Sequence, residues 1–66
     1  MSQPGAPLGL AIELTDEQVW AFAQFLKRVA VHDYRRLAVD LDEAYAMRDA
    51  GEAIRAALAE QGYAPR

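Results

Sequence analysis

The 66-residue sequence contains no cysteine, and histidine, serine and threonine occur once each, as His32, Ser2 and Thr15. The absence of cysteine excludes disulfides and thiolate metal sites. The one histidine cannot form a catalytic relay with its neighbour Asp33, because adjacent residues on a helix point about 100° apart. No spacing of carboxylates around it supports a metal site. We therefore expect no enzymatic activity, no metal and no cofactor.

Long apolar runs and an excess of positive charge are also missing. No apolar stretch approaches the ~20 residues that span a bilayer, and no basic segment followed by an apolar one indicates secretion. We therefore expect a cytoplasmic protein. Seven Lys and Arg stand against ten Asp and Glu, a net charge of −3, which argues against general binding to phosphate backbones.

What the chain does have is apolar side chains, which make up 53% of its residues. A chain of this length is near the lower limit for burying a self-sufficient core and usually gains a disulfide, a metal or a second subunit. Only the second subunit remains, and a homodimer is its commonest form. We expect residues 1–7, with two prolines and one glycine, to be a flexible tail and residues 8–66 to form one small helical domain.

The segment after this tail has the period of a β-strand with one apolar face. A single short strand needs a partner, and no second strand pattern follows in the chain. The segment therefore either pairs with the same segment of another subunit or lies extended across the helices. Its apolar residues are Leu8, Leu10, Ile12 and Leu14, which alternate with Gly9, Ala11 and Glu13.

Residues 14–30 carry the clearest helix signals. Thr15 is a good N-cap, and Gln18 three residues later completes a capping box. At about 100° per residue, the side chains that follow separate into an apolar and a polar face. The predicted core face consists of Val19, Phe22, Phe25, Leu26 and Val29.

Trp20 does not fit this division, because it lies on the polar face between Gln24 and Lys27. It either meets a second surface or covers the edge of the core, and the sequence favours neither. Tyr45 is placed in the same way on the polar face of a later helix. Trp and Tyr are frequent in interface hot spots. The predicted partner-binding residues are Trp20, Gln24, Lys27 and Tyr45.

Two further helices are predicted after the first. Residues 31–39 have the spacing of a short helix, and residues 40–62 form a long one with Asp40 as its N-cap and Glu43 in its capping box. Gly62 and Tyr63 predict a Schellman end, with the tyrosine packed back on Leu58. The long helix carries a stripe, largely of small residues, that we expect to pack closely on the first helix: Ala44, Met47, Ala50, Gly51, Ile54, Ala57 and Leu58.

Together these elements predict a mainly helical fold with two long antiparallel helices, a short connecting helix and an extended N-terminal segment, in a homodimer. A cluster of basic residues offers nucleic-acid binding as an alternative function, although a solvated charged face is the commoner explanation of such a run. The possible nucleic-acid contacts are Lys27, Arg28, Arg35 and Arg36.

The segments ELTDEQVWAFAQFLKRV and DEAYAMRDAGEAIRAALAEQGYAPR resemble a group of short, functionally uncharacterised proteins of proteobacteria and their mobile elements. The resemblance spans nearly all of residues 13–66 and implies a bacterial cytoplasmic setting and a phage or mobile-element association, without any site residue. Small proteins of such origin often block a host protein complex. We therefore expect a small acidic interaction module of this kind, with an unidentified protein as partner.

The order of a strand and then helices is also similar to ribbon-helix-helix repressors, which dimerise through one strand per subunit. Those proteins read DNA bases with polar side chains on the outer face of the strand. Here that face would offer Gly9, Ala11 and Glu13, which are poor contacts for bases. The similarity supports a dimer through the strand but not the reading of DNA.

Overall fold

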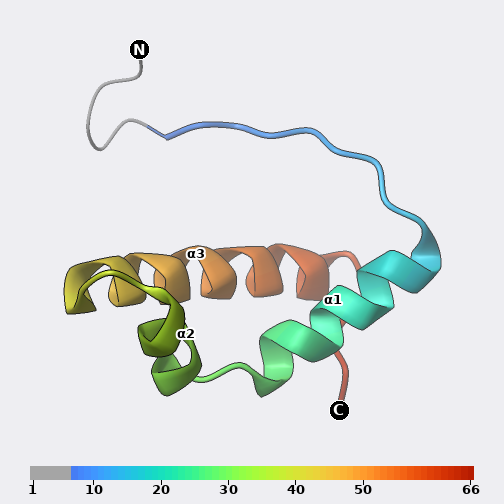
Figure 1. Ribbon diagram of the computed structural model, residues 1–66. Coiled ribbons are helices and arrows are strands. Elements are labelled where there is room, and N and C mark those ends of the chain that lie inside the picture. The colour runs from blue at the N-terminus through green and yellow to red at the C-terminus, as the bar shows by residue number, and fades with distance from the viewer. Residues whose placement is uncertain (1–6) are drawn as a thin grey trace.

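The computed structural model describes residues 7–66, and these form three helices and no strand (Figure 1). The helices are α1 (Asp16–Arg28), α2 (Val31–Leu37) and α3 (Leu41–Glu60). The short α2 links the end of α1 to the start of α3. The prediction of a mainly helical protein is confirmed. Of the predicted tail, 1–7, all but Pro7 lies outside the described residues.

The segment before α1 is extended but pairs with nothing in the described part of the chain. Figure 1 shows it running back along the side of α3 that faces away from α1 and α2. Its apolar side chains are largely in solvent, with Leu8, Leu10 and Ile12 exposed by 75%, 80% and 74%. We call Leu8–Leu14 the arm. Within one chain the arm is neither a strand nor a cover for the helices.

The helix starts follow the predicted caps. The Thr15 hydroxyl accepts the N–H of Gln18 at 3.1 Å, and the Gln18 side-chain oxygen accepts the N–H of Thr15 at 2.9 Å. The Asp40 carboxylate accepts the N–H of Glu43 at 2.8 Å. The Glu43 carboxylate, however, accepts the N–H of Val39 at 3.0 Å instead of completing the box with the cap residue. The bonds from the N–H groups of Gln18 and Glu43 satisfy donors that the first turn of a helix leaves without a partner.

The end of α3 is the predicted Schellman motif. Gly62 has a φ of +95°, a left-handed conformation that glycine adopts at little cost. The N–H of Tyr63 donates to the carbonyl of Leu58 at 2.9 Å, and the N–H of Gly62 donates to that of Ala59 at 3.0 Å. This turn reverses the chain, so the C-terminal residues return to α1.

The core is small and depends on short side chains. Ala23, Leu26 and Ala44 are its buried apolar residues, and Gly51 is buried beside them. A Cβ on Gly51 would overlap the hydroxyl of Tyr34 from α2 and lie 3.6 Å from Leu26 Cδ2 of α1. The predicted close contact at Gly51 is therefore present, and it involves α2 as well as α1.

The face of α1 that packs differs from the predicted one. Phe22 and Phe25 are 41% and 49% exposed, so their assignment to the core is wrong. The packed side chains are instead Ala23 and Leu26, which are buried, and Val19, which is half-buried. The centre of this arc lies about 60° round the helix from that of the predicted face. Alanine at 23 allows a close approach to α3 that a phenylalanine ring would prevent. On α3, Ile54 of the predicted stripe is likewise exposed.

Candidate interaction surfaces

Trp20 lies at the edge of the packed face of α1 and contacts the returning C-terminal segment. Its ring meets that of Tyr63 edge to face, with centroids 5.1 Å apart and planes at 68°. The Tyr63 hydroxyl donates a hydrogen bond to the Asp16 carboxylate at 3.1 Å. This bond, together with the negative charge of Asp16, raises the pKa of Tyr63 above its ordinary value. Trp20 is thus held by its own chain and still 40% exposed.

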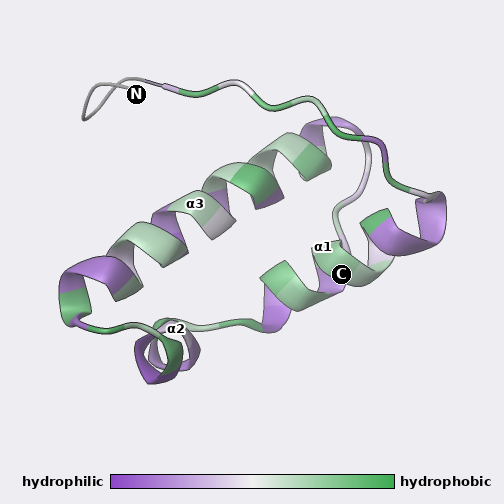
Figure 2. Cartoon of the chain, turned by 45° about the horizontal axis from the view of Figure 1, so that its top comes forward, coloured by the Kyte–Doolittle hydropathy of each residue, from purple (hydrophilic) through white to green (hydrophobic). Residues whose placement is uncertain are grey.

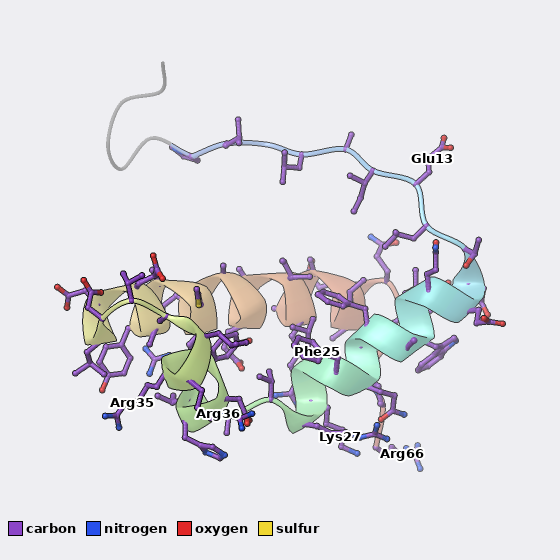
Figure 3. The ribbon with its side chains drawn as sticks, in the orientation of Figure 1. Glu13, Phe25, Lys27, Arg35, Arg36 and Arg66 are labelled. Carbon is purple, nitrogen blue, oxygen red and sulfur yellow. The ribbon has the colours of Figure 1, made fainter. Side chains whose placement is uncertain are left out.

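Gln24 and Lys27 continue from Trp20 along one side of α1, because residues four and seven positions apart share a helix face. Gln24 is half-buried and Lys27 is exposed. Figure 3 shows Lys27 and Arg66 on the same side of the molecule, where the C-terminal residues pass α1. We call Trp20, Gln24, Lys27 and Tyr63 the Trp20 surface. It presents the partly exposed Trp20 ring, beside the half-buried Tyr63, on the same side of α1 as the exposed Lys27.

Tyr45 is not part of this surface. It lies in the second turn of α3, whereas Trp20 contacts the residues beyond the last turn of that helix. The two positions are separated by about 20 Å along the helix axis. The Arg48 guanidinium lies over the Tyr45 ring, 4.9 Å from its centroid, and also bonds the Asp49 carboxylate at 2.8 Å. The structure brings together three of the four predicted partner-binding residues and places Tyr45 elsewhere.

The predicted basic cluster comes from the last turns of α1 and α2. Figure 3 shows Lys27, Arg35 and Arg36 projecting from one side of the molecule. Arg36 lies 3.6 Å from the Asp33 carboxylate, which also has His32 at 3.4 Å. In the described residues no carboxylate lies within 4 Å of the charged groups of Lys27, Arg28 or Arg35. These side chains therefore direct positive charge into solvent.

A further surface was missed in the sequence because it depends on how the three helices meet. An open groove of about 640 Å³ is bounded by all three helices, and a shallower hollow beside Phe22 continues it along α1. The rings of Phe22 and Phe25 stack there, with centroids 5.4 Å apart. We call this the Phe groove. Its apolar lining comprises Ala21, Phe22, Phe25, Val29, Leu37 and Met47, and its polar lining comprises Arg28, Asp33, Tyr34 and Arg36.

The aromatic spacing in α1 was the one available signal for this groove. Phe22 and Phe25 lie on the flank of the apolar face that is farthest from Trp20. Figure 2 shows hydrophobic residues on α1 and along the arm, in addition to those between the helices. The chain therefore exposes two separate apolar surfaces, the arm and the groove.

The described residues contain neither a metal-binding cluster nor a helix suited to a membrane. Among residues 7–66, no group of three or more His, Cys, Asp or Glu side chains is arranged to hold a metal ion. In the same residues, no helix combines the length and the hydropathy that crossing a membrane requires.

Comparison with known proteins identifies a family whose function is unknown. The model of the group described as "Family of unknown function (DUF7706)" matches residues 1–66. Neither the curated proteins nor the solved structures contain a match to this sequence. Residue roles must therefore come from the geometry of the chain itself.

Proposed function

We propose that this chain, which belongs to the DUF7706 family, is a small helical module that binds another protein through the Trp20 surface. The observation that carries the proposal is the Trp20–Tyr63 pair, whose rings are held edge to face while Trp20 keeps 40% of its surface in solvent. An aromatic ring already held in one orientation loses little entropy when a partner covers it. Trp and Tyr are also the side chains that dominate binding hot spots.

The flanking residues supply specificity. Gln24 offers both a donor and an acceptor, and Lys27 has no carboxylate within 4 Å in the described residues, so an acidic group of the partner can pair with it. We propose a partner that presents an apolar residue to Trp20 and a carboxylate to Lys27. Tyr45 would contact only a partner that extends along the length of α3.

The wider proposal has further parts that rest on the sequence. We include a homodimer, because the buried core is small for a chain of this length, and an antiparallel pairing of α1 and α3. We also include action in the cytoplasm, where the module would block a host protein complex. That last role rests on the resemblance to phage and mobile-element proteins alone.

Nucleic-acid binding is the second candidate, and the shared orientation of Lys27, Arg35 and Arg36 (Figure 3) is the observation in its favour. Several exposed cations on one side could contact successive phosphates. The net charge of −3 weighs against it, because acidic residues elsewhere repel the same phosphates.

Affinity capture from native lysate with charge-reversal variants separates these two functions. Lys27→Glu lies on the Trp20 surface, whereas Arg35→Glu is a matched control on α2 with the same charge change. We expect Lys27→Glu to abolish capture of the protein partner and Arg35→Glu to retain it. Equal losses in both variants, with binding to a nucleic-acid duplex that falls steeply as salt rises, would support the second candidate. Unchanged capture in Lys27→Glu would contradict the role of the Trp20 surface.

A further inference from the structure

We propose that the Phe groove of each chain binds the arm of a second copy, which gives a homodimer with two exchanged arms. This inference specifies the homodimer included in the proposed function, and it leaves the Trp20 surface free for another partner. Its starting point is that one chain exposes both an apolar groove and an apolar segment. In the arm, the side chain of Leu10 is 80% exposed. In the groove, the stacked rings of Phe22 and Phe25 are about half-exposed.

The arm and the groove match in length and pattern. Seven residues of extended chain span about 20 Å from Leu8 to Leu14. The groove and its extension follow α1 from Gln18 to Val29, about 16 Å, and continue onto Leu37 of α2. Because side chains alternate along an extended segment, all four large apolar residues of the arm can face the groove together.

The area of such a contact is close to what a specific dimer needs. An extended segment of about 700 Da exposes roughly 1,000 Å², more than the groove can cover. If each arm covers the lining of the groove and its extension and buries an equal area of its own, two arms bury roughly 900 Å² in total, near the ~1,000 Å² expected of a specific interface. The two contacts are related by a two-fold axis, so the assembly closes at two copies.

Charge also favours this occupant. Glu13 is the arm's only charged residue, and it lies on the face opposite the large apolar side chains. Figure 3 shows its side chain directed away from the helices of its own chain. With the apolar face of the arm in the groove, Glu13 stays in solvent, so binding buries no charge of the arm.

A second copy is a better source of the arm than the same chain. The arm leaves α1 at Thr15 with extended backbone angles, φ −70° and ψ 159°. It then runs on the side of α3 away from α1 and α2 (Figure 1). To reach its own groove, it would have to reverse at the residue that caps α1. An arm from another copy needs no change at this cap.

Sedimentation of the full chain tests the dimer with a matched pair of variants. Leu10→Asp puts a charge on the apolar face of the arm, and Ala11→Asp puts the same charge on the opposite face. We expect a dimeric wild type, a dimer dissociation constant raised at least about 100-fold by Leu10→Asp, and one changed less than about fivefold by Ala11→Asp. Phe25→Asp should act like Leu10→Asp. A monomeric wild type at every concentration, or equal effects of the two arm variants, would overturn the proposal.

Disulfide trapping identifies what the arm contacts, since the natural sequence has no cysteine. A chain with Leu10→Cys is mixed with a chain of different length that carries Ala21→Cys in the groove. Exchanged arms predict a rapid disulfide between the two different chains. Faster cross-linking of Leu10→Cys chains to one another would show that two arms pair as strands. An intramolecular disulfide in the double variant, independent of concentration, would show that the arm binds its own groove; either result contradicts exchange.

These measurements are independent of the proposed partner function. Sedimentation reports the dimer without any partner present, and Lys27→Glu should remain dimeric while it loses partner capture. A dimer without partner binding would contradict only the Trp20 surface, and partner binding by a monomeric wild type would contradict only the exchanged arms. Circular dichroism of each variant verifies that the helices are retained.

Discussion

The aromatic residues on the two flanks of α1 differ in what they contact within the chain. On one flank, Trp20 meets Tyr63 edge to face. On the other flank, Phe22 and Phe25 stack on each other and stay about half-exposed. Trp20, which lies on the polar face in the sequence, therefore contacts a residue far along the chain, and it is no more exposed than Phe22 from the apolar face, at 40% against 41%.

This difference shows that hydrophobicity alone does not select the packed arc of a helix. The arc that packs contains Ala23, which is buried, and at Gly51 of α3 the side chains of Tyr34 and Leu26 occupy the space that a larger residue would need. Close contact at small residues is favourable because it brings many atoms into van der Waals range. Turning α1 toward the phenylalanines would place large rings at this point and would separate the helices.

The largest expected effect tests which face of α1 packs against the rest of the chain. Leu26→Ala removes a buried side chain and should lower the free energy of unfolding by about 3 kcal/mol. Phe22→Ala should cost about 1 kcal/mol, because the ring is 41% exposed and so loses less buried area on truncation. Both should be measured by urea denaturation in a chain that also carries Leu10→Asp, which removes the proposed arm contact. A larger loss of unfolding free energy for Phe22→Ala than for Leu26→Ala would show that α1 packs through the face predicted from the sequence.

The next effect tests the close approach at Gly51. Gly51→Ala gains about 1 kcal/mol of helix propensity but overlaps the Tyr34 hydroxyl, and overpacking costs about 1–3 kcal/mol. We expect a net loss of about 1 kcal/mol. In a Tyr34→Phe background the hydroxyl is absent and the next atom, Cζ, is 3.4 Å from the added Cβ. There the same substitution should be neutral or stabilising, as thermal unfolding can show; equal losses in both backgrounds would contradict this contact.

A smaller effect tests the other flank. A double-mutant cycle of Trp20→Ala and Tyr63→Ala should give a coupling energy of about 1 kcal/mol, the usual value for an edge-to-face pair. Phe22→Ala paired with Tyr63→Ala is the control and should give additive losses. Coupling close to zero between Trp20 and Tyr63 would mean that the two rings do not hold each other, and Trp20 would then be free to reorient in a complex.

The smallest effect is a pH dependence at the same contact. The hydrogen bond to Asp16 and the charge of Asp16 raise the pKa of Tyr63 above its ordinary value of 10.0. A raised pKa in the folded state contributes stability that is complete below the unfolded pKa and is lost as pH rises through the folded pKa. The free energy of unfolding should therefore fall more above pH 10 in the wild type than in Tyr63→Phe. Asp16→Asn should return the tyrosine titration, followed by absorbance, toward its ordinary pKa.

The sequence by itself determined where the helices start and stop. Thr15 with Gln18, Asp40 with Glu43, and Gly62 act on backbone groups only a few residues away, so the local pattern contains the necessary information. The detail at Glu43 differed, because its carboxylate accepts the N–H of Val39 and not that of Asp40. The bond from the N–H of Ala30 to Asp33 at the start of α2 was not predicted. The predicted interaction face Trp20–Gln24–Lys27 also follows from helix geometry alone, and its function stays a prediction.

Only the tertiary structure decided which side of α1 is covered. That choice depends on Gly51 and Tyr63, which lie far from α1 in the sequence, and on the total contact that the three helices gain together. A helical wheel contains none of these distances. The structure therefore gave Trp20 an aromatic neighbour within the chain, separated Tyr45 from it, and left Phe22 and Phe25 beside a groove for which the arm of a second copy is our proposed occupant.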